Sequence, residues 1–242
     1  MFSDGTNSEE WLLWTDVPRD AFINMAIDEA IISAAEKLGG RPLLRIYGWD
    51  CPSISIGYSQ QFPENIEKKY TVVRRITGGG VVFHDCDLTY TFIIPAGHRI
   101  CKLDRNESYR ILHSPIIKFF RISGVESELS PESKMPQERS RMVCFESPAK
   151  FDVVTPDRKL AGGAQRRTRK GILHQGSVKI GGMSHSSKRI QKNFLLAYKE
   201  EFGIEFVPYN LSEELFEISE KLCSEKYSLD SWNRDKRTQP VL

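Results

Sequence analysis

The sequence predicts an α+β fold with mixed, largely antiparallel β-sheets and flanking helices. Short runs rich in β-branched and aromatic residues recur along the chain, and a few longer stretches between them have helical periodicity. The 242 residues are 40% hydrophobic and 27% charged, which is typical of a globular protein that can bury one sizeable core. We therefore expect a single domain over residues 1–242.

The predicted helices are amphipathic. Apolar side chains recur near helical spacing at about residues 20–38, and Gly39-Gly40 ends this stretch. A second helix is expected at about 106–121, and the tail from about residue 186 is also expected to be helical.

The predicted strands are short and fall into two groups. Those of the first half lie at about 44–47, 53–57, 71–75, 80–83 and 88–94, and those of the second half at about 150–154, 158–164 and 172–180. Between the groups, the polar segment 127–141 contains two prolines and many charges. We expect it to be a surface loop, and its place before Cys144 makes it a candidate lid.

A glycine-rich stretch at residues 74–85, Arg-Arg-Ile-Thr-Gly-Gly-Gly-Val-Val-Phe-His-Asp, stands before the predicted strand 88–94. Glycines allow backbone N–H groups to approach an anion, and arginine forks match carboxylate or phosphate oxygens. The alternative is an ordinary glycine-rich hairpin whose arginines face solvent. The candidate binding residues of this stretch are Arg74, Arg75, Thr77, Gly78, Gly79, Gly80 and His84.

Composition excludes several classes of protein. The formal net charge of +2 gives no sign of nucleic-acid binding, and no apolar run approaches the roughly 18 residues of a membrane span. The N-terminus lacks the basic-then-apolar order of a signal peptide, so we expect a cytoplasmic protein. The five cysteines are odd in number and widely spaced, which predicts neither a disulfide framework nor a metal site.

The glycine-rich stretch resembles the corresponding loop of the superfamily of lipoate–protein ligase A, lipoate-ligase-like octanoyltransferases and biotin ligases. Further segments resemble the same superfamily: residues 24–30 its first helix, 44–49 and 53–60 the next two strands, and 159–167 and 173–178 its later active-site strands. The resemblance covers about residues 10–210. It implies the biotin/lipoate ligase catalytic-domain fold, which is similar to that of class II synthetases.

Two residues carry the catalytic roles that the resemblance implies. Lys159 matches the active-site lysine, which would hold the acyl carbonyl; in isolation it would be read as a solvated turn lysine. Cys144 matches the nucleophilic cysteine of the octanoyltransferases, whereas ligases commonly have Asn-Asp there; a bare cysteine would more often be structural. The other residues expected at the pocket are Arg45, Tyr47, Gln60, Gly162, Gly163, Ala164, His174 and Gly176.

The resemblance implies an octanoyltransferase of protein lipoylation. Octanoate would pass from octanoyl-acyl carrier protein to a Cys144 thioester, and then to a lysine of a lipoyl domain in 2-oxoacid dehydrogenase E2 subunits or the glycine cleavage H protein. No cofactor or metal is expected, and the protein is expected to be a monomer.

Two alternatives remain. An ATP-dependent lipoate–protein ligase would form lipoyl-AMP with Mg²⁺, with Arg74, Arg75 and the glycine loop around the phosphate. The cysteine and the lack of a separate C-terminal accessory domain count against it. The third possibility is a catalytically silent acyl- or carrier-binding protein, against which the intact Lys159, Cys144 and glycine loop argue.

Overall fold

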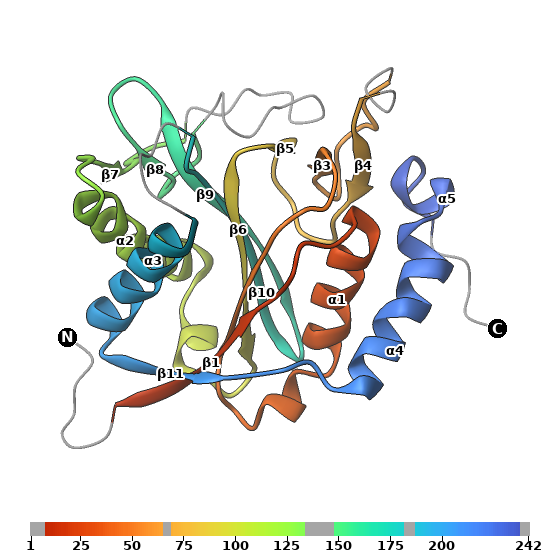
Figure 1. The fold of residues 1–242 in the computed structure, drawn as a ribbon, viewed down its shortest axis with the longest axis horizontal. Coiled ribbons are helices and arrows are strands. Elements are labelled where there is room, and N and C mark those ends of the chain that lie inside the picture. The colour runs from red at the N-terminus through yellow and green to blue at the C-terminus, as the bar shows by residue number, and fades with distance from the viewer. Residues whose placement is uncertain (1–7, 65–68, 134–147, 182–186, 238–242) are drawn as a thin grey trace.

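A computed structural model describes residues 8–64, 69–133, 148–181 and 187–237. Its centre is an eight-stranded sheet in the order β11-β1-β2-β6-β10-β9-β8-β7 (Figure 1). The pairs from β2 to β7 are antiparallel, and β1 pairs in parallel with both β2 and β11. The predicted α+β class with largely antiparallel sheets is therefore confirmed. The strands are β1 (Glu9–Thr15), β2 (Leu43–Tyr47), β6 (Asp87–Pro95), β7 (Glu128–Leu129), β8 (Val153–Val154), β9 (Lys159–Thr168), β10 (Gly171–Lys179) and β11 (Ile204–Pro208).

A second, three-stranded sheet holds the glycine loop. Its central strand β3 (Ser53–Ile56) pairs in parallel with β4 (Thr71–Arg74) and antiparallel with β5 (Val82–His84). The loop connects β4 to β5, so the three glycines lie between two strands, as the sequence predicts.

Helices cover both faces of the central sheet. Figure 1 shows α2 (Arg105–Ile122) and α3 (Ser187–Phe202) on one side and α1 (Ala21–Ser33) and α4 (Glu213–Leu222) on the other. The chain continues from α4 through a π-helical turn (Cys223–Tyr227) to the short α5 (Asp230–Asn233); 3₁₀ turns occupy Ala35–Leu38 and Arg99–Lys102.

Local chemistry explains where α1 begins and ends. The Asp20 side chain accepts hydrogen bonds from the Phe22 and Ile23 N–H groups and caps the helix. After Ser33 the chain continues as the 3₁₀ turn, and Gly39 ends it with a φ of 62°. The predicted end at Gly39-Gly40 is confirmed.

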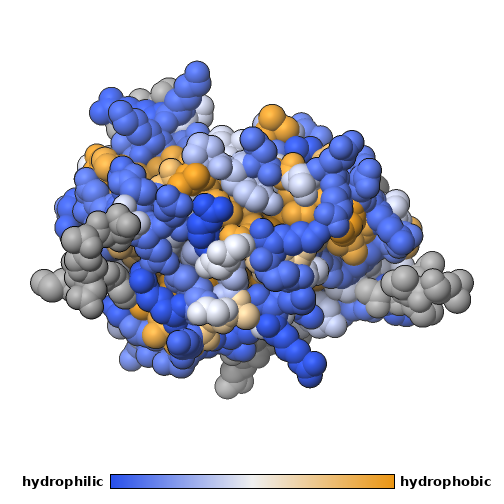
Figure 2. All heavy atoms as spheres, turned by 90° about the horizontal axis from the view of Figure 1, so that it is seen from below, coloured by the Kyte–Doolittle hydropathy of each residue, from blue (hydrophilic) through white to orange (hydrophobic). Residues whose placement is uncertain are grey.

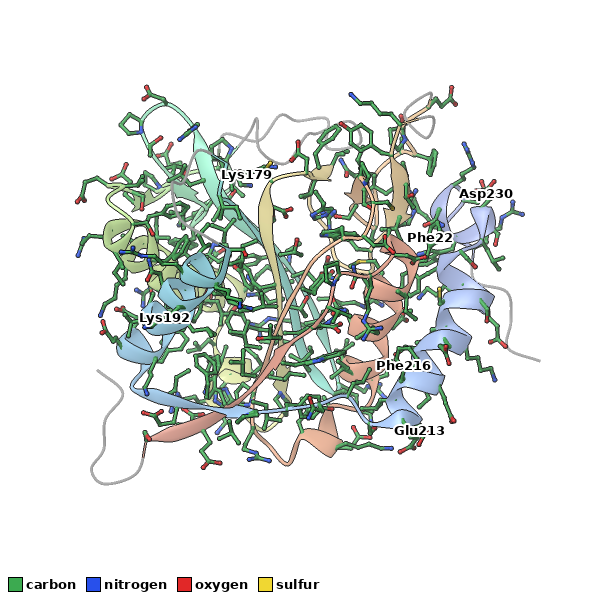
Figure 3. The ribbon with its side chains drawn as sticks, in the orientation of Figure 1. Phe22, Lys179, Lys192, Glu213, Phe216 and Asp230 are labelled. Atoms are coloured by element: carbon green, nitrogen blue, oxygen red, sulfur yellow. The ribbon has the colours of Figure 1, made fainter. Side chains whose placement is uncertain are left out.

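The core has two layers because the central strands are buried on both faces. On β6, Phe92 belongs to the cluster under α2 and α3, and its neighbour Ile93 belongs to the cluster under α1. Side chains fill the space on both sides of the sheet (Figure 3). The surface in Figure 2 is mostly hydrophilic with small apolar spots, and no helix in the described ranges is long and apolar enough to cross a bilayer.

Three strands were missed by the sequence analysis. The two-residue β7 lies in segment 127–141, which was expected to be a surface loop. β1 lies before the first expected element, and β11 lies within the tail that was expected to be helical. β1 and β11 pair with each other, from Glu9 opposite Ile204 to Leu13 opposite Pro208, so each is stabilised by a segment almost the whole chain away. The strand expected at 150–154 is reduced to Val153–Val154, because Phe151 has a φ of 68° and does not extend.

Candidate active site

A pocket lies between the small sheet and the central sheet, and the pocket together with its opening to solvent holds about 450 Å³ of space free of protein atoms. Eight of the expected site residues line it: Tyr47, Arg75, Gly79, His84, Gly162, Gly163, Ala164 and Gly176. The remaining lining residues are Met25, Trp49, Ser55, Val82, Thr89, Gln175 and Ser177. The sequence analysis did not name these seven. Most lie in segments that resemble the superfamily, but the resemblance does not say which side chains of a segment face the pocket.

The glycine loop wraps the Arg75 side chain. Its Nη2 donates to the carbonyl oxygens of Gly78 and Gly80, both at 2.7 Å, and its Nη1 donates to the Ser55 carbonyl at 2.8 Å. Gly79, between them, has a φ of 86°, which a residue with a Cβ adopts only at a cost. The carbonyl oxygens of the loop thus accept hydrogen bonds from the Arg75 guanidinium and hold this charged group at the pocket wall.

Arg74 lies away from the pocket. It is fully buried, and among the described residues its guanidinium donates to backbone carbonyl oxygens: Gly57, Tyr58 and Gln60 on one side and Trp232 and Asn233 on the other. The structure therefore corrects the expectation that Arg74 binds the substrate. Its contacts tie the turn after β3 to α5.

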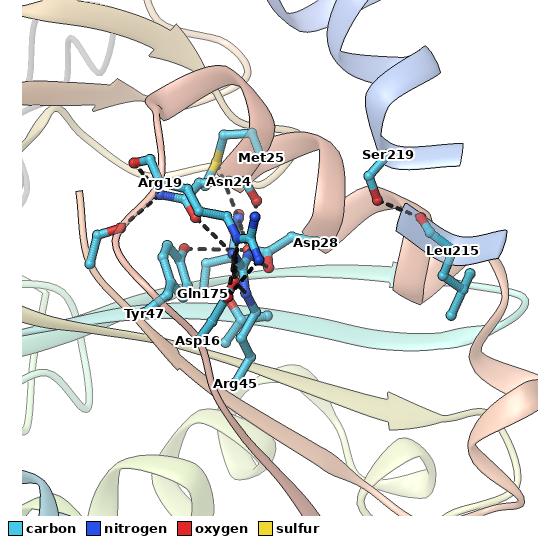
Figure 4. A network of polar contacts seen from close by, with 12 residues as sticks. Asp16, Arg19, Asn24, Met25, Asp28, Arg45, Tyr47, Gln175, Leu215 and Ser219 are labelled. Atoms are coloured by element: carbon cyan, nitrogen blue, oxygen red, sulfur yellow. Dashed lines mark hydrogen bonds and ion pairs between the residues drawn. The ribbon is translucent and has the colours of Figure 1, made fainter. Parts of the chain in front are cut away.

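Arg45 also supports the site from behind (Figure 4). Its five N–H donors all go to protein acceptors: Asp16 twice, Asp28 once, and the carbonyl and side-chain oxygens of Asn24. Burial opposes its charge, yet the nearby carboxylates, Asp28 foremost, raise the pKa of Arg45 on balance. The binding role expected for Arg45 is thus replaced by a structural one.

Asp28 connects the Arg45 hydrogen-bond network to a pocket-lining residue, Gln175. Its Oδ2 accepts hydrogen bonds from the Thr91 hydroxyl at 2.7 Å and from Gln175 Nε2 at 2.8 Å. Thr77 donates to Gln175 Oε1 at 2.6 Å. Thr77 therefore orients a pocket-lining side chain and does not line the pocket itself.

Lys159 does not line the pocket; a buried ion pair holds its side chain against Gly162, which does. Its Nζ lies 2.7 Å from Asp152 Oδ2, and the two side chains are only 2% and 3% exposed. A Cβ on Gly162 would lie 2.6 Å from this Nζ, so the ammonium sits directly behind a lining residue. Because Gly162 has no side chain, the Lys159 ammonium can lie against the Gly162 backbone in the pocket wall. Asp152 was missed from the sequence, although it stands in the strand expected just before Lys159.

His174 lies behind the pocket wall and does not line it. Its Nε2 is 3.3 Å from His113 Nε2 and 3.5 Å from the Tyr90 hydroxyl. Burial, and then the neighbouring His113, hold the pKa of His174 well below its usual value, and burial also lowers that of His113. Both imidazoles are therefore neutral near neutral pH, which argues against a direct role for His174 in holding an anion.

His84 does line the pocket, between two polar partners. Its Nε2 is 2.9 Å from Ser55 Oγ, and its Nδ1 is 2.9 Å from Asp87 Oδ2. The Trp49 ring stacks on the imidazole with centroids 3.9 Å apart.

Cys144 lies outside the described residues, as does most of the candidate lid 127–141. Within the described ranges, no group of three or more His, Cys, Asp or Glu side chains could hold a metal ion.

The fold is that of a lipoyl-ligase type of catalytic domain, and this pocket is its candidate active site. Among solved structures, the chain is similar to a putative lipoate protein ligase from Thermoplasma acidophilum, with 22% identity, a TM-score of 0.78, and 93% of this chain and 99% of that chain covered. It is similar also to a lipoate–protein ligase A bound with ATP, with 22% identity, a TM-score of 0.77, and coverage of 93% and 98%.

The chain belongs to the family of the lipoyl protein ligase A/B catalytic domain, whose model matches residues 20–219. Two curated relatives are named octanoyltransferase LipM. The one from Bacillus cereus is 27% identical, with 94% of this chain and 99% of the relative covered. The one from Oceanobacillus iheyensis is 29% identical, with coverage of 91% and 95%.

Proposed function

We propose that this protein is an octanoyltransferase of protein lipoylation in the cytoplasm. It takes the octanoyl group of octanoyl-acyl carrier protein onto Cys144 and passes it to a lysine of a lipoyl-domain acceptor, such as an E2 subunit or the glycine cleavage H protein. The curated relatives named octanoyltransferase, which match over nearly their whole length, support this proposal.

The observation that carries the proposal is the Lys159 ammonium behind Gly162. Acyl transfer builds negative charge on the carbonyl oxygen, and a preorganised buried cation stabilises that charge without reorganising solvent. The carbonyl would lie against Gly162 and Gly163, and the chain would fill the pocket, where each buried methylene contributes on the order of 0.8 kcal/mol.

The chemistry proceeds in two balanced steps. The Cys144 thiolate attacks the thioester carbonyl, the bond to the donor sulfur breaks, and the donor leaves as a thiol after taking a proton. The acceptor lysine amine then attacks the enzyme thioester, an amide forms, and the cysteine sulfur leaves. Neither step needs ATP or a metal, and a monomer suffices for both.

The second candidate is an ATP-dependent lipoate–protein ligase that uses Mg²⁺. The Arg75 guanidinium, which the Gly78-Gly79-Gly80 loop holds at the pocket wall, favours it, because an arginine fork suits a phosphate. Against it, the Arg74 guanidinium donates to backbone carbonyl oxygens away from the pocket, and this was one of the two arginines that the ligase mechanism placed around the phosphate.

Intact-protein mass spectrometry after incubation with octanoyl-acyl carrier protein, without ATP, tests the proposal. We expect a hydroxylamine-labile octanoyl adduct on the wild type that is transferable to a lipoyl domain and absent from Cys144→Ala. Cys86→Ala is the matched control, since Cys86 is an exposed cysteine outside the pocket lining, and it should keep the adduct. Lipoylation that requires lipoate with Mg-ATP and survives Cys144→Ala would instead identify a ligase.

A further inference from the structure

Three pocket-side residues form a continuous hydrogen-bonded chain from a hydroxyl through an imidazole to a carboxylate. Ser55 Oγ lies 2.9 Å from His84 Nε2, and His84 Nδ1 lies 2.9 Å from Asp87 Oδ2. This is the order of groups that activates a serine for acyl transfer. We propose that Ser55, His84 and Asp87 form a second acyl-transfer centre, which hydrolyses medium-chain acyl thioesters and esters independently of Cys144.

The other partners of Asp87 fix the direction of the hydrogen bonds. Its Oδ2 accepts from the Thr89 hydroxyl at 2.9 Å and from the Ser177 hydroxyl at 2.6 Å. Burial raises the pKa of Asp87, but the adjacent His84 and these hydroxyl donors lower it on balance, so the carboxylate is ionised near neutral pH. Because an ionised carboxylate only accepts, His84 donates from Nδ1. Its Nε2 lone pair then faces Ser55.

The surroundings stabilise the charges that such a reaction creates. The Trp49 ring lies almost parallel to the His84 ring, at 19°, and an aromatic face stabilises an imidazolium. Trp49 itself is fixed by its Nε1–H, which donates to the Thr89 hydroxyl at 2.9 Å. On the other side, Arg75 Nη1 lies 3.1 Å from Ser55 Oγ, where its positive charge favours an anionic oxygen.

The centre opens onto the pocket described above. Ser55 and His84 line it on the side of the small sheet, and Gly162 and Gly163 line it on the side of the central sheet. An acyl group bound there lies between the two walls. The substrate class is therefore the same kind of activated acyl compound as in the proposed transfer, with water as the acceptor.

The reaction balances with water alone. The Ser55 oxygen attacks the carbonyl carbon as its proton passes to His84 Nε2. The carbon–sulfur or carbon–oxygen bond of the substrate breaks, and the leaving group takes that proton from His84. Water then attacks the acyl-serine ester, gives a proton to His84, and the free acid leaves as Ser55 recovers its proton.

Labelling with a fluorophosphonate tests this centre directly, because the reagent bonds covalently to activated serine oxygens and releases fluoride. The experiment uses Cys144→Ala protein, so its outcome does not depend on the proposed octanoyl transfer. We expect an adduct that maps to the Ser55 peptide. Absence of label from that peptide in the Cys144→Ala protein would overturn the proposal, whatever the variants below do.

A neighbouring serine provides the matched control. Ser53 lies on the same strand, is buried, and donates to the Cys51 carbonyl at 2.9 Å, outside the pocket lining. In the Cys144→Ala background, Ser53→Ala should keep both the label and the hydrolysis of 4-nitrophenyl octanoate. Ser55→Ala should lose the label and hydrolyse this ester on the order of 10²-fold more slowly. Equal hydrolysis in the two variants would contradict the proposal.

Asp87 acts through His84 and is a positioning residue. Asp87→Asn replaces the carboxylate by a neutral amide whose NH2 can donate to His84 Nδ1 and hold the imidazole in the wrong tautomer. Ser55 should then be labelled on the order of 10²-fold more slowly while the near-ultraviolet circular dichroism stays that of the parent. A parental labelling rate in Asp87→Asn would exclude the imidazole–carboxylate pair from the activation of Ser55.

Discussion

At the residue scale, the charged side chains buried behind this pocket form hydrogen bonds and ion pairs with other protein groups instead of with water. Arg45 is the extreme case, since all five of its donors are used inside the core. Arg45→Lys keeps the charge but has a single nitrogen with three donors, which cannot reach Asp16, Asn24 and Asp28 together. We expect it to lower the free energy of unfolding by about 3–5 kcal/mol in urea titrations, the cost of breaking a buried ion pair.

An exposed arginine gives the control for that substitution. Arg41 pairs with Glu10 at 3.2 Å, with side-chain exposures of 43% and 56%. Arg41→Lys should change the free energy of unfolding by less than about 1 kcal/mol, because exposed pairs contribute little. If the two substitutions cost the same, the Arg45 network has no structural role.

The buried histidine pair predicts a dependence of stability on pH. Burial holds the pKa values of His174 and His113 below those of the unfolded chain, so the unfolded state binds more protons between the folded and unfolded values. Stability is then complete above about pH 6.5, the usual histidine pKa, and falls as the pH drops below it. Each histidine contributes a slope of up to about 1.4 kcal/mol per pH unit.

Urea titrations of wild type and His174→Leu between pH 5.5 and pH 8 measure this effect. The difference in unfolding free energy between the two proteins should shift in favour of the variant as the pH falls, because the variant has one fewer group to protonate. A constant packing loss cancels in this comparison. A difference that does not vary with pH would mean that His174 titrates alike in the folded and unfolded states.

At the element scale, the glycine loop is shaped by one backbone conformation. Gly79 has a φ of 86°, and a Cβ there would lie 3.0 Å from Arg75 Nη2. Gly79→Ala should therefore cost about 1–3 kcal/mol of stability and weaken octanoyl transfer, because the loop lies on the pocket wall. Gly78→Ala is its matched control: a Cβ on Gly78 meets nothing within 4 Å, and its φ is ordinary. Similar thermal midpoints and transfer rates for the two variants would contradict this account of the loop.

Elements with strong local patterns were predictable from the sequence. The expected strand at 88–94 became β6, since its nearly continuous run of β-branched and aromatic residues suits a strand buried on both faces. The strand expected at 172–180 became β10. β1 and β11 were not predictable in this way, because each depends on the other across the chain.

The candidate site was also predictable only where local sequence patterns determine it, and not where contacts between distant segments do. The motif predicted Arg75, Gly79 and His84 as binding residues, and all three line the pocket. It could not separate Arg75 from Arg74, because the acceptors of Arg74 include carbonyl oxygens of α5, 158 and 159 positions away. Two adjacent arginines on one strand end point to opposite sides, and only the tertiary contacts decide which side is the pocket.

At the scale of the whole molecule, one sheet joins both core layers, so damage to one layer should be felt in the other. Phe194 on α3 is fully buried against Tyr90 and Tyr198, on the face away from the pocket. Phe194→Ala should lower the global free energy of unfolding by about 3–5 kcal/mol and speed hydrogen exchange of the α1 amides, in the other layer, by the same free energy. Leu196→Ala on the same helix, at a side chain 38% exposed, should change both by less than about 1 kcal/mol. Faster exchange confined to α3 would instead mean that the two layers unfold separately.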